Sequence, residues 1–248
     1  MDGLFPRDAV IRRVNGEGVL LLGGGRALLM QLAHPSVAAG VADHSDFQRD
    51  PFRRLQGTLD AMTTVVYGSG EQARQMAAIL ERVHARVVGP GYSANDPELL
   101  WWVYATLIDT ALRMHRRFLR PLSPPESAEF YAQSLIVAEL LGVPASLPPA
   151  TIDDFNAYIR HMVSVLRVSE TARVLSRSVL HPQLPRLTEP AMELVRQVTA
   201  GLTPRPLREQ YGLAWDAPRK AALLAAGAAA RQVLPRLPSP LRRFPVAA

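Results

Sequence analysis

Helical periodicity, interrupted at intervals by Gly, Pro and capping residues, is the feature that most constrains the fold of this chain. Between residues 76 and 87, for example, apolar residues recur at i, i+3, i+4, i+7 and i+11, which is one face of a helix. Alternating Val/Ile-rich segments bounded by turn residues do not recur, and no Gly-x-Gly-x-x-Gly follows a strand-like run. The sequence therefore predicts an all-α protein, with residues 1–248 forming a single helical domain.

Turn and capping residues set the expected helix boundaries. Ser69 with Gln72 predicts a capping box, and Asp50 an N-cap. A core over about residues 10–215 is expected to carry residues 216–248, a C-terminal helix and a Pro-rich tail, packed on it, with 234–240 extended over the surface. The helices are expected at about 8–14, 26–33, 36–42, 51–67, 70–88, 97–119, 124–141, 153–166, 189–200 and 217–233.

The chain has no cysteine, which narrows its metal chemistry. Disulfides, thiolate metal sites, iron–sulfur clusters and covalent haem attachment through Cys are excluded. Any metal would be held by His, Asp, Glu, Tyr or Met, and any haem would be non-covalent. The longest small and apolar run, 221–230, is far shorter than the roughly 20 residues of a membrane span. We therefore expect no membrane span and a soluble, cytoplasmic protein.

The formal net charge is +6, and Lys220 is the only lysine. A basic protein of this kind suits a nucleic-acid partner when its charges cluster. Here the arginines are scattered and no five consecutive basic residues occur, which is typical of an Ala/Arg/Pro-rich composition. We expect no nucleic-acid partner, and a helical nucleic-acid binder is the least supported hypothesis.

His84 is the most informative residue for function. It follows Leu80 by four residues, so it falls on the apolar face of its helix. An imidazole buried there without a partner costs roughly 1–3 kcal/mol, so a carbonyl, a carboxylate, a water or a metal is needed. Glu81 precedes it by three residues, but a di-iron bundle needs two such Glu-x-x-His pairs. The residues alone leave the partner open.

Thr106, Asp109 and Arg113 run along one side of a helix that is apolar nearly all round and therefore central. Asp109 and Arg113 are four residues apart and are expected to pair. Such a buried pair is often structural, and it can also present the arginine to an anionic group such as a propionate.

Three further features have structural as well as functional interpretations. Gly57 lies in mid-helix between Arg54 and Thr58, at a cost of about 1 kcal/mol relative to Ala, which indicates either a bulky neighbour or a helix crossing. His34 and His44 flank the helix at 36–42, where capping or packed histidines are common. The three glycines at 23–25 favour a tight turn or close helix packing over a phosphate cradle.

Three stretches, with their order and spacing, resemble a known family. They are residues 32–47 with 50–58, residues 83–89, and residues 96–118. In them we find LAHPSVAAGVADHSDF, then DPFRRLQGT, then VHARVVG, then DPELLWWVYATLIDT. This pattern resembles the oxygenase family also called DUF2236, which includes the rubber oxygenases (latex clearing proteins) and the fungal mycophenolate-pathway oxygenase.

The resemblance implies a globin-like all-α fold that binds haem b non-covalently, with His84 as the iron ligand. The apolar faces around the site predict a small apolar substrate, with alkenes among the candidates. The resemblance implies O2 or peroxide as the oxidant and an electron-donor protein as a partner. Arg54, Gly57 and Thr58 match the Arg-x-x-Lys-Thr motif of the haem pocket. The residues expected to act are His84 as metal ligand; Arg54, Gly57, Thr58, Thr106, Asp109 and Arg113 around the cofactor, with Arg54 and Arg113 on its propionates; and Thr58, His34 and His44 as hydrogen-bond donors to bound oxygen.

The chain departs from the family pattern at three places. Gly57 stands where the motif has its lysine, and Tyr104 stands where many members have His. No residue around 34–44 matches the glutamate that acts as base in the rubber oxygenases. These departures argue against rubber cleavage, and they leave a non-catalytic haem-binding sensor or carrier as the alternative to an oxygenase.

Overall fold

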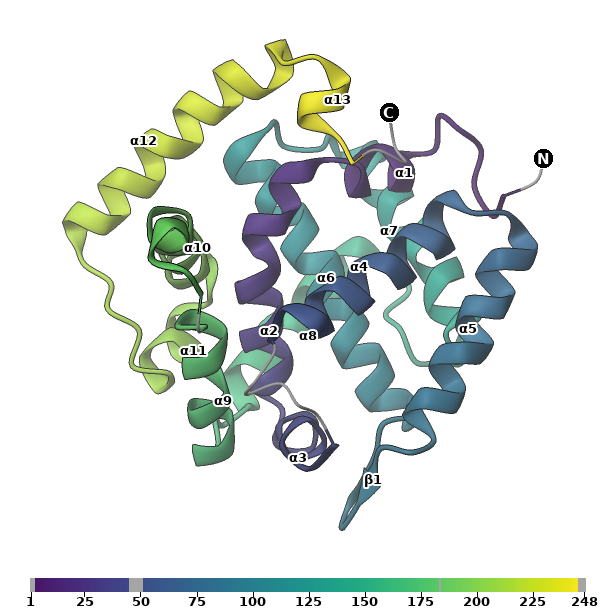
Figure 1. The fold of residues 1–248 in the computed structure, drawn as a ribbon. Helices are drawn as coiled ribbons and strands as arrows, with labels where there is room; N and C mark the ends of the chain where they lie inside the picture. The colour runs from purple at the N-terminus through teal and green to yellow at the C-terminus, as the bar shows by residue number, and fades with distance from the viewer. Residues whose placement is uncertain (1–2, 45–50, 183, 245–248) are drawn as a thin grey trace.

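Helices arranged around a central helix, α6, build the protein in a computed structural model (Figure 1). The structure describes residues 3–44, 51–182 and 184–244, with backbone alone for 51–55, so Asp50 and the Arg54 side chain lie outside the described part. The elements are α1 (Val10–Asn15), η1 (Gly18–Gly23), α2 (Gly24–Leu32), α3 (Pro35–His44), α4 (Pro51–Tyr67), α5 (Gly70–His84), β1 (Val88–Gly89), β2 (Tyr92–Ser93), α6 (Pro97–Phe118), α7 (Pro124–Leu140), α8 (Ile152–Val165), α9 (Glu170–Leu180), η3 (Arg186–Thr188), α10 (Glu189–Leu202), α11 (Arg205–Gln210), α12 (Ala217–Val233), η4 (Leu234–Arg236) and α13 (Ser239–Arg242).

The all-α prediction is confirmed, and each expected helix is present with shifts of a few residues. The largest shift is in α5, which ends at His84 because the chain turns there into the β1–β2 hairpin. Gly91 has φ of 77° in the hairpin turn, a conformation that favours glycine. Helices α9 and α11 were not expected. The tail was expected to be extended, which is wrong: η4 and α13 are helical turns, each with a proline in its first turn.

Helix α6 is central because it is buried on almost every side. Asp96 caps it by accepting a hydrogen bond from the Glu98 N–H, and Pro97 occupies the first turn. Trp101 and Trp102 are 2% and 1% exposed and pack against Tyr158 of α8. The main core surrounds this end of α6, and a smaller core beside α12 surrounds its other end.

A buried ion-pair network joins α2 to α6. The Arg26 side chain is fully buried and pairs with Asp109, whose carboxylate also accepts from Arg113 Nε at 2.9 Å. Arg26 further donates to Thr110 Oγ1 at 2.5 Å and to the Leu202 carbonyl at 2.8 Å. The expected Asp109–Arg113 pair is therefore present, within a larger network that also ties α10 to the centre.

Close packing explains the glycines at the start of α2. A Cβ at Gly25 would overlap Thr199 Oγ1 on α10, and one at Gly23 would lie 2.8 Å from Thr110 Cγ2 on α6. Gly23 and Gly25 therefore serve close helix packing, which is one of the two structural interpretations expected for this glycine run.

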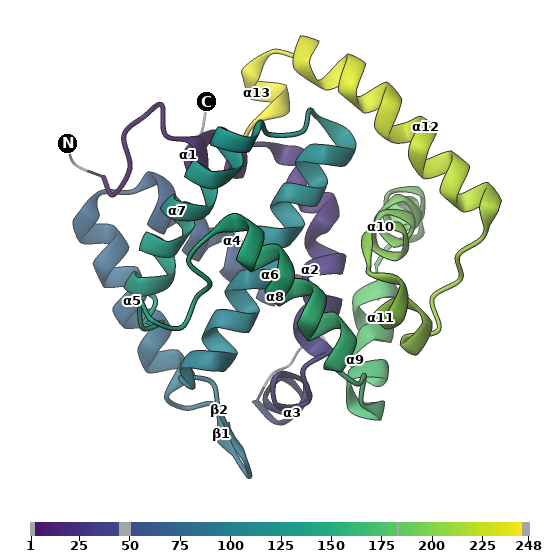
Figure 2. The ribbon, with the colours of Figure 1, turned by 180° about the vertical axis from the view of Figure 1, so that it is seen from behind.

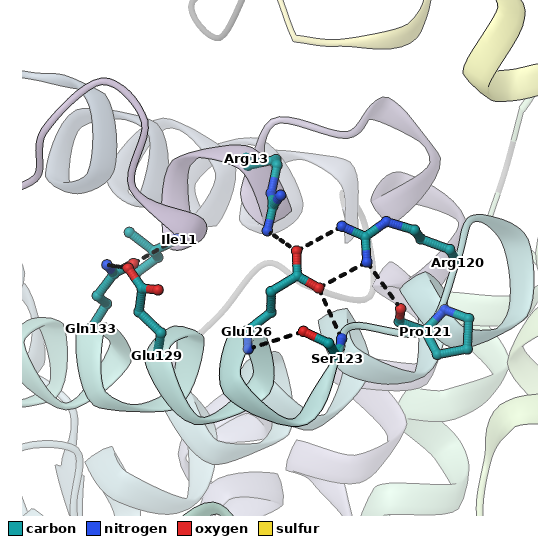
Figure 3. A network of polar contacts seen from close by, with 8 residues as sticks. All are labelled: Ile11, Arg13, Arg120, Pro121, Ser123, Glu126, Glu129 and Gln133. Atoms are coloured by element: carbon teal, nitrogen blue, oxygen red, sulfur yellow. Dashed lines mark hydrogen bonds and ion pairs between the residues drawn. The ribbon is translucent and has the colours of Figure 1, made fainter.

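Polar contacts fix α1 on α7 at the end of α6 (Figure 3). Glu126 accepts from Arg13 Nη2 at 2.5 Å and from Arg120 at 2.6 and 2.8 Å, and the Ser123 N–H donates to it at 2.8 Å. These contacts, the hydrogen bonds from Arg120 first among them, lower the pKa of Glu126. The Ile11 N–H donates to Gln133 Oε1 at 2.7 Å on the same side of α7.

The C-terminal segment returns to the start of the chain. Helix α12 runs along the outside, packs against α6 and α10, and leads through α13 back to α1 (Figures 1 and 2). There Arg243 forms a β-bridge with Glu17, and the Phe244 N–H donates to the Gly16 carbonyl at 2.9 Å.

Candidate functional site

His84 is the last residue of α5, and its half-buried imidazole lines a pocket. Helix α5 begins at a capping box in which Ser69 and Gln72 satisfy each other's backbone N–H groups, as predicted. The walls come from α3, α5, the hairpin and α6. They are Ser36, Val37, Gly40, Val41, His44, Val83, Val87, Tyr92, Ala94, Leu99, Leu100 and Val103.

The apolar face of α5 is less buried than its periodicity suggests. Ile79 and Val83 are 44% and 52% exposed, and Ala73 is the buried residue of the helix. The physical reason is position: α5 lies at the edge of the molecule and packs mainly against α4 (Figure 1). The expectation of a core imidazole is therefore wrong, since His84 faces a pocket at the end of an edge helix.

The hairpin wall of this pocket is held on α3. Tyr92 donates from its hydroxyl to Asp43 Oδ2 at 2.6 Å, and this hydrogen bond raises the pKa of Tyr92 to about 12. His44 Nε2 lies 2.9 Å from the Val88 carbonyl oxygen, and the His44 ring meets Tyr92 edge-on with centroids 6.3 Å apart. A Cβ at Gly40 would lie 3.4 Å from Tyr92 and Val87, which is a normal van der Waals contact.

His34 lies in the turn between α2 and α3, outside the lining of the His84 pocket. Burial lowers its pKa, while Asp96 and Glu98 at the start of α6 act in the opposite direction. Its imidazole is therefore neutral at pH 7. Among the described residues, no hydrogen-bond partner reaches His34 Nδ1.

Gly57 and Thr58 lie on α4, the helix antiparallel to α5. Gly57 is exposed, and in the described part of the chain no atom lies within 4 Å of where its Cβ would be. The helix-crossing interpretation of Gly57 is therefore unsupported, and the surface of α4 is open there. Thr58 is half-buried and lines a second pocket between α4 and α6.

The two pockets follow each other along one face of α6. Leu100 and Val103 line the His84 pocket, while Leu107 and Ala111 line the Thr58 pocket. Their spacings of three, four and four residues place all four on one face. Val103 and Leu107 are separated by about 6 Å along the axis, at 1.5 Å per residue. Apolar residues of one face of α6 therefore line both pockets.

A comparison with models of protein families matches residues 11–232 to a catalytic domain described as "ER-bound oxygenase mpaB/B′/Rubber oxygenase". The chain belongs to this oxygenase family. No curated protein and no solved structure matched it. The oxygenase match begins in α1 and ends just before the last residue of α12, so η4 and α13 lie beyond it.

Not all of the expected site residues lie near His84 in this oxygenase domain. Thr106 is fully buried and donates to the Val103 carbonyl of its own helix at 2.7 Å. Asp109 and Arg113 line a third pocket, with Arg116 and Asp153. The structure thus brings His84 and His44 together in one pocket, and it separates them from Thr58 and from the Asp109–Arg113 pair.

Sequence reasoning missed Arg26, the fully buried partner of Asp109. Its position in an apolar segment after three glycines is the signal that was available. It also missed Tyr92 of β2, which lies in the hairpin wall and outside the helical pattern, and its hydrogen-bond partner Asp43 near the end of α3. In the described residues, no helix is long and apolar enough to cross a membrane.

Proposed function

We propose that the protein is a haem-b-dependent oxygenase that acts on a small apolar molecule with O2 or peroxide, and that His84 is the iron ligand. One observation carries this proposal: an oxygenase-family domain presents the half-buried imidazole of His84, with the exposed His44 nearby, in a pocket whose other walls are mainly Val, Leu and Ala. Imidazole nitrogen is the commonest protein ligand of haem iron in globins and peroxidases.

The residues around His84 fit the group. A porphyrin supplies four nitrogen ligands itself, so one axial side chain and a flat apolar slot are what the protein must add. Val83, Val87 and Val103 offer such surface beside the imidazole. Among the described residues there is no group of three or more His, Asp or Glu that could hold a metal ion without a porphyrin. When bound, the haem would supply the activation of O2 or peroxide.

The chain's own residues would orient the site and keep it dry. The end of α5 positions His84, and the His44 contact with the Val88 carbonyl holds the hairpin against α3 as a wall. The Leu100 and Val103 side chains exclude water from the same space. Gly57 leaves the surface of α4 open, but it lies outside the lining of the His84 pocket. Arg54 remains the proposed partner of a propionate, since Arg113 lines a different pocket.

The proposal is tested by the visible spectrum of protein produced with added haem. We expect a Soret band in the wild type and its loss or marked shift in His84→Ala. His161→Ala removes an exposed histidine of α8 and is the matched control, which should keep the wild-type band. Absence of the band in the wild type, or an unchanged band in His84→Ala, would overturn the ligand assignment.

A non-catalytic haem-binding sensor or carrier is the second proposal, and Gly57 favours it. The rubber-oxygenase motif that the chain resembles has lysine at this position, and here the space is open. Incubation of the haem-loaded protein with an alkene and O2 separates the two proposals. Product formation supports the oxygenase, whereas haem uptake without turnover supports the sensor or carrier.

A further inference from the structure

The Thr58 pocket is a mainly apolar space between η1, α2, α4 and α6, and it is separate from the His84 lining. Its principal walls are Leu20, Leu59, Met62 and Leu107. Two polar side chains at its edge are already engaged: Thr110 Oγ1 accepts from Arg26, and the Tyr67 hydroxyl donates to the Arg12 carbonyl at 2.6 Å. The interior therefore suits a hydrocarbon chain more than a polar ligand.

One wall of this pocket comes from the far end of the chain. Phe244 lies in the lining beside residues of η1 and α4, although more than 180 residues separate it in sequence from Thr58. We call residues 234–244 the C-terminal strap. The strap lies beyond the segment that matches the oxygenase family, which ends at residue 232. This wall therefore lies outside the segment that matches the family.

A set of contacts latches the strap in place. Glu17 is 3% exposed and accepts from Arg242 Nη2 at 2.6 Å and Nε at 2.9 Å. Arg243 approaches the same carboxylate at 3.8 Å, and the Phe244 N–H donates to the Gly16 carbonyl at 2.9 Å. A bidentate hydrogen bond from an arginine to a buried carboxylate is a specific and directional contact. The latch thus positions Phe244 against the pocket.

We propose that the Thr58 pocket binds the hydrocarbon part of the substrate, and that Phe244 closes its end and determines how long a chain fits. One face of α6 lines both pockets, with Val103 in the His84 pocket and Leu107 in this one, so the two pockets are neighbours along the helix. The identification of the ligand as the substrate rests on the proposed function. The binding of hydrocarbon in this pocket, and the limit that Phe244 sets on its length, are independent of that function.

The test is displacement of the fluorescent apolar probe aminoanthracene from the full-length protein by linear alcohols of increasing length. Each buried methylene should raise affinity about fourfold, until the pocket is full and the gain stops. Phe244→Ala should move this plateau to longer alcohols, and Phe244→Trp should move it to shorter ones. Arg242→Ala, which removes the latch, should change the plateau in the direction of Phe244→Ala.

Leu241→Ala is the matched control, because Leu241 lies on the same strap, is 75% exposed and does not line the pocket. Its length profile should equal that of the wild type. The inference is overturned if the probe does not bind, or if the Phe244 variants keep the wild-type plateau. His84→Ala separates the two proposals: loss of the Soret band with an unchanged alcohol profile supports both, whereas an unchanged Soret band refutes the haem ligand alone.

Discussion

Removal of the Asp109 carboxylate should be one of the most damaging single changes outside the pockets. The Asp109 side chain is 4% exposed and that of Arg26 is 0% exposed, so the two charges depend on each other for compensation. In Asp109→Ala, Arg26 keeps its bonds to Thr110 and Leu202 but has no counter-charge. Breaking a buried pair on one side costs about 3–5 kcal/mol, against a total stability of about 5–15 kcal/mol for a typical domain.

Urea unfolding followed by helical circular dichroism measures this loss. Arg113→Ala is the control: its side chain is 41% exposed, so its pairing with Asp109 should contribute less than about 1 kcal/mol. The double variant Arg26→Met with Asp109→Leu removes both buried charges and should recover most of the stability lost in Asp109→Ala. The reasoning fails if Asp109→Ala unfolds within about 1 kcal/mol of the wild type, or if the double variant is no better.

The same carboxylate should make the wild type sensitive to acid. Burial acts to raise the pKa of Asp109, but the charges of Arg26 and Arg113 and their hydrogen bonds outweigh it, and the pKa is lowered. A lowered folded-state pKa stabilises the protein above the unfolded value of about 3.9 and loses that contribution as the pH falls through the folded value. The stability of the wild type should therefore fall below about pH 4 more steeply than that of Asp109→Ala.

Urea unfolding also tests the smaller packing and capping effects. Gly25→Ala should cost about 1–3 kcal/mol because its Cβ overlaps Thr199 Oγ1, and Thr199→Ala should relieve part of that loss. Gly57→Ala, at an open and exposed helical position, should stabilise by up to about 1 kcal/mol; a loss there would show that the space is needed for folding. Ser69→Ala should cost about 0.5–2 kcal/mol by removing the capping box with Gln72, and an unchanged unfolding midpoint would contradict that role.

Helix boundaries were predictable where local chemistry determines them. The bounds of α12 follow from Asp216 as N-cap and Pro218 in the first turn, and they match the prediction. Helix α9 was missed because no strong helix break precedes it, although Ser169 caps it. Helix α11 was missed because it is short and follows Pro204 in a segment rich in proline. The strap was misjudged for a tertiary reason, since its turns are held by Glu17, a residue far away in sequence.

The site was harder to predict than the fold because one helix serves three pockets. Periodicity places Thr106, Asp109 and Arg113 on a face of α6 turned by about a third of the circumference from Val103 and Leu107, at 100° per residue. It does not say which neighbour each face meets. Arg26, from α2, pairs with Asp109, and α8 and α7 enclose Arg113 in a separate polar pocket. The face of α6 that carries Val103 and Leu107 points toward α3, α4 and α5. Apolar surface, rather than the ion pair, therefore lies beside His84. A buried charged residue on a central helix therefore does not by itself indicate a cofactor site. A second residue of the chain, here Arg26, can neutralise it instead.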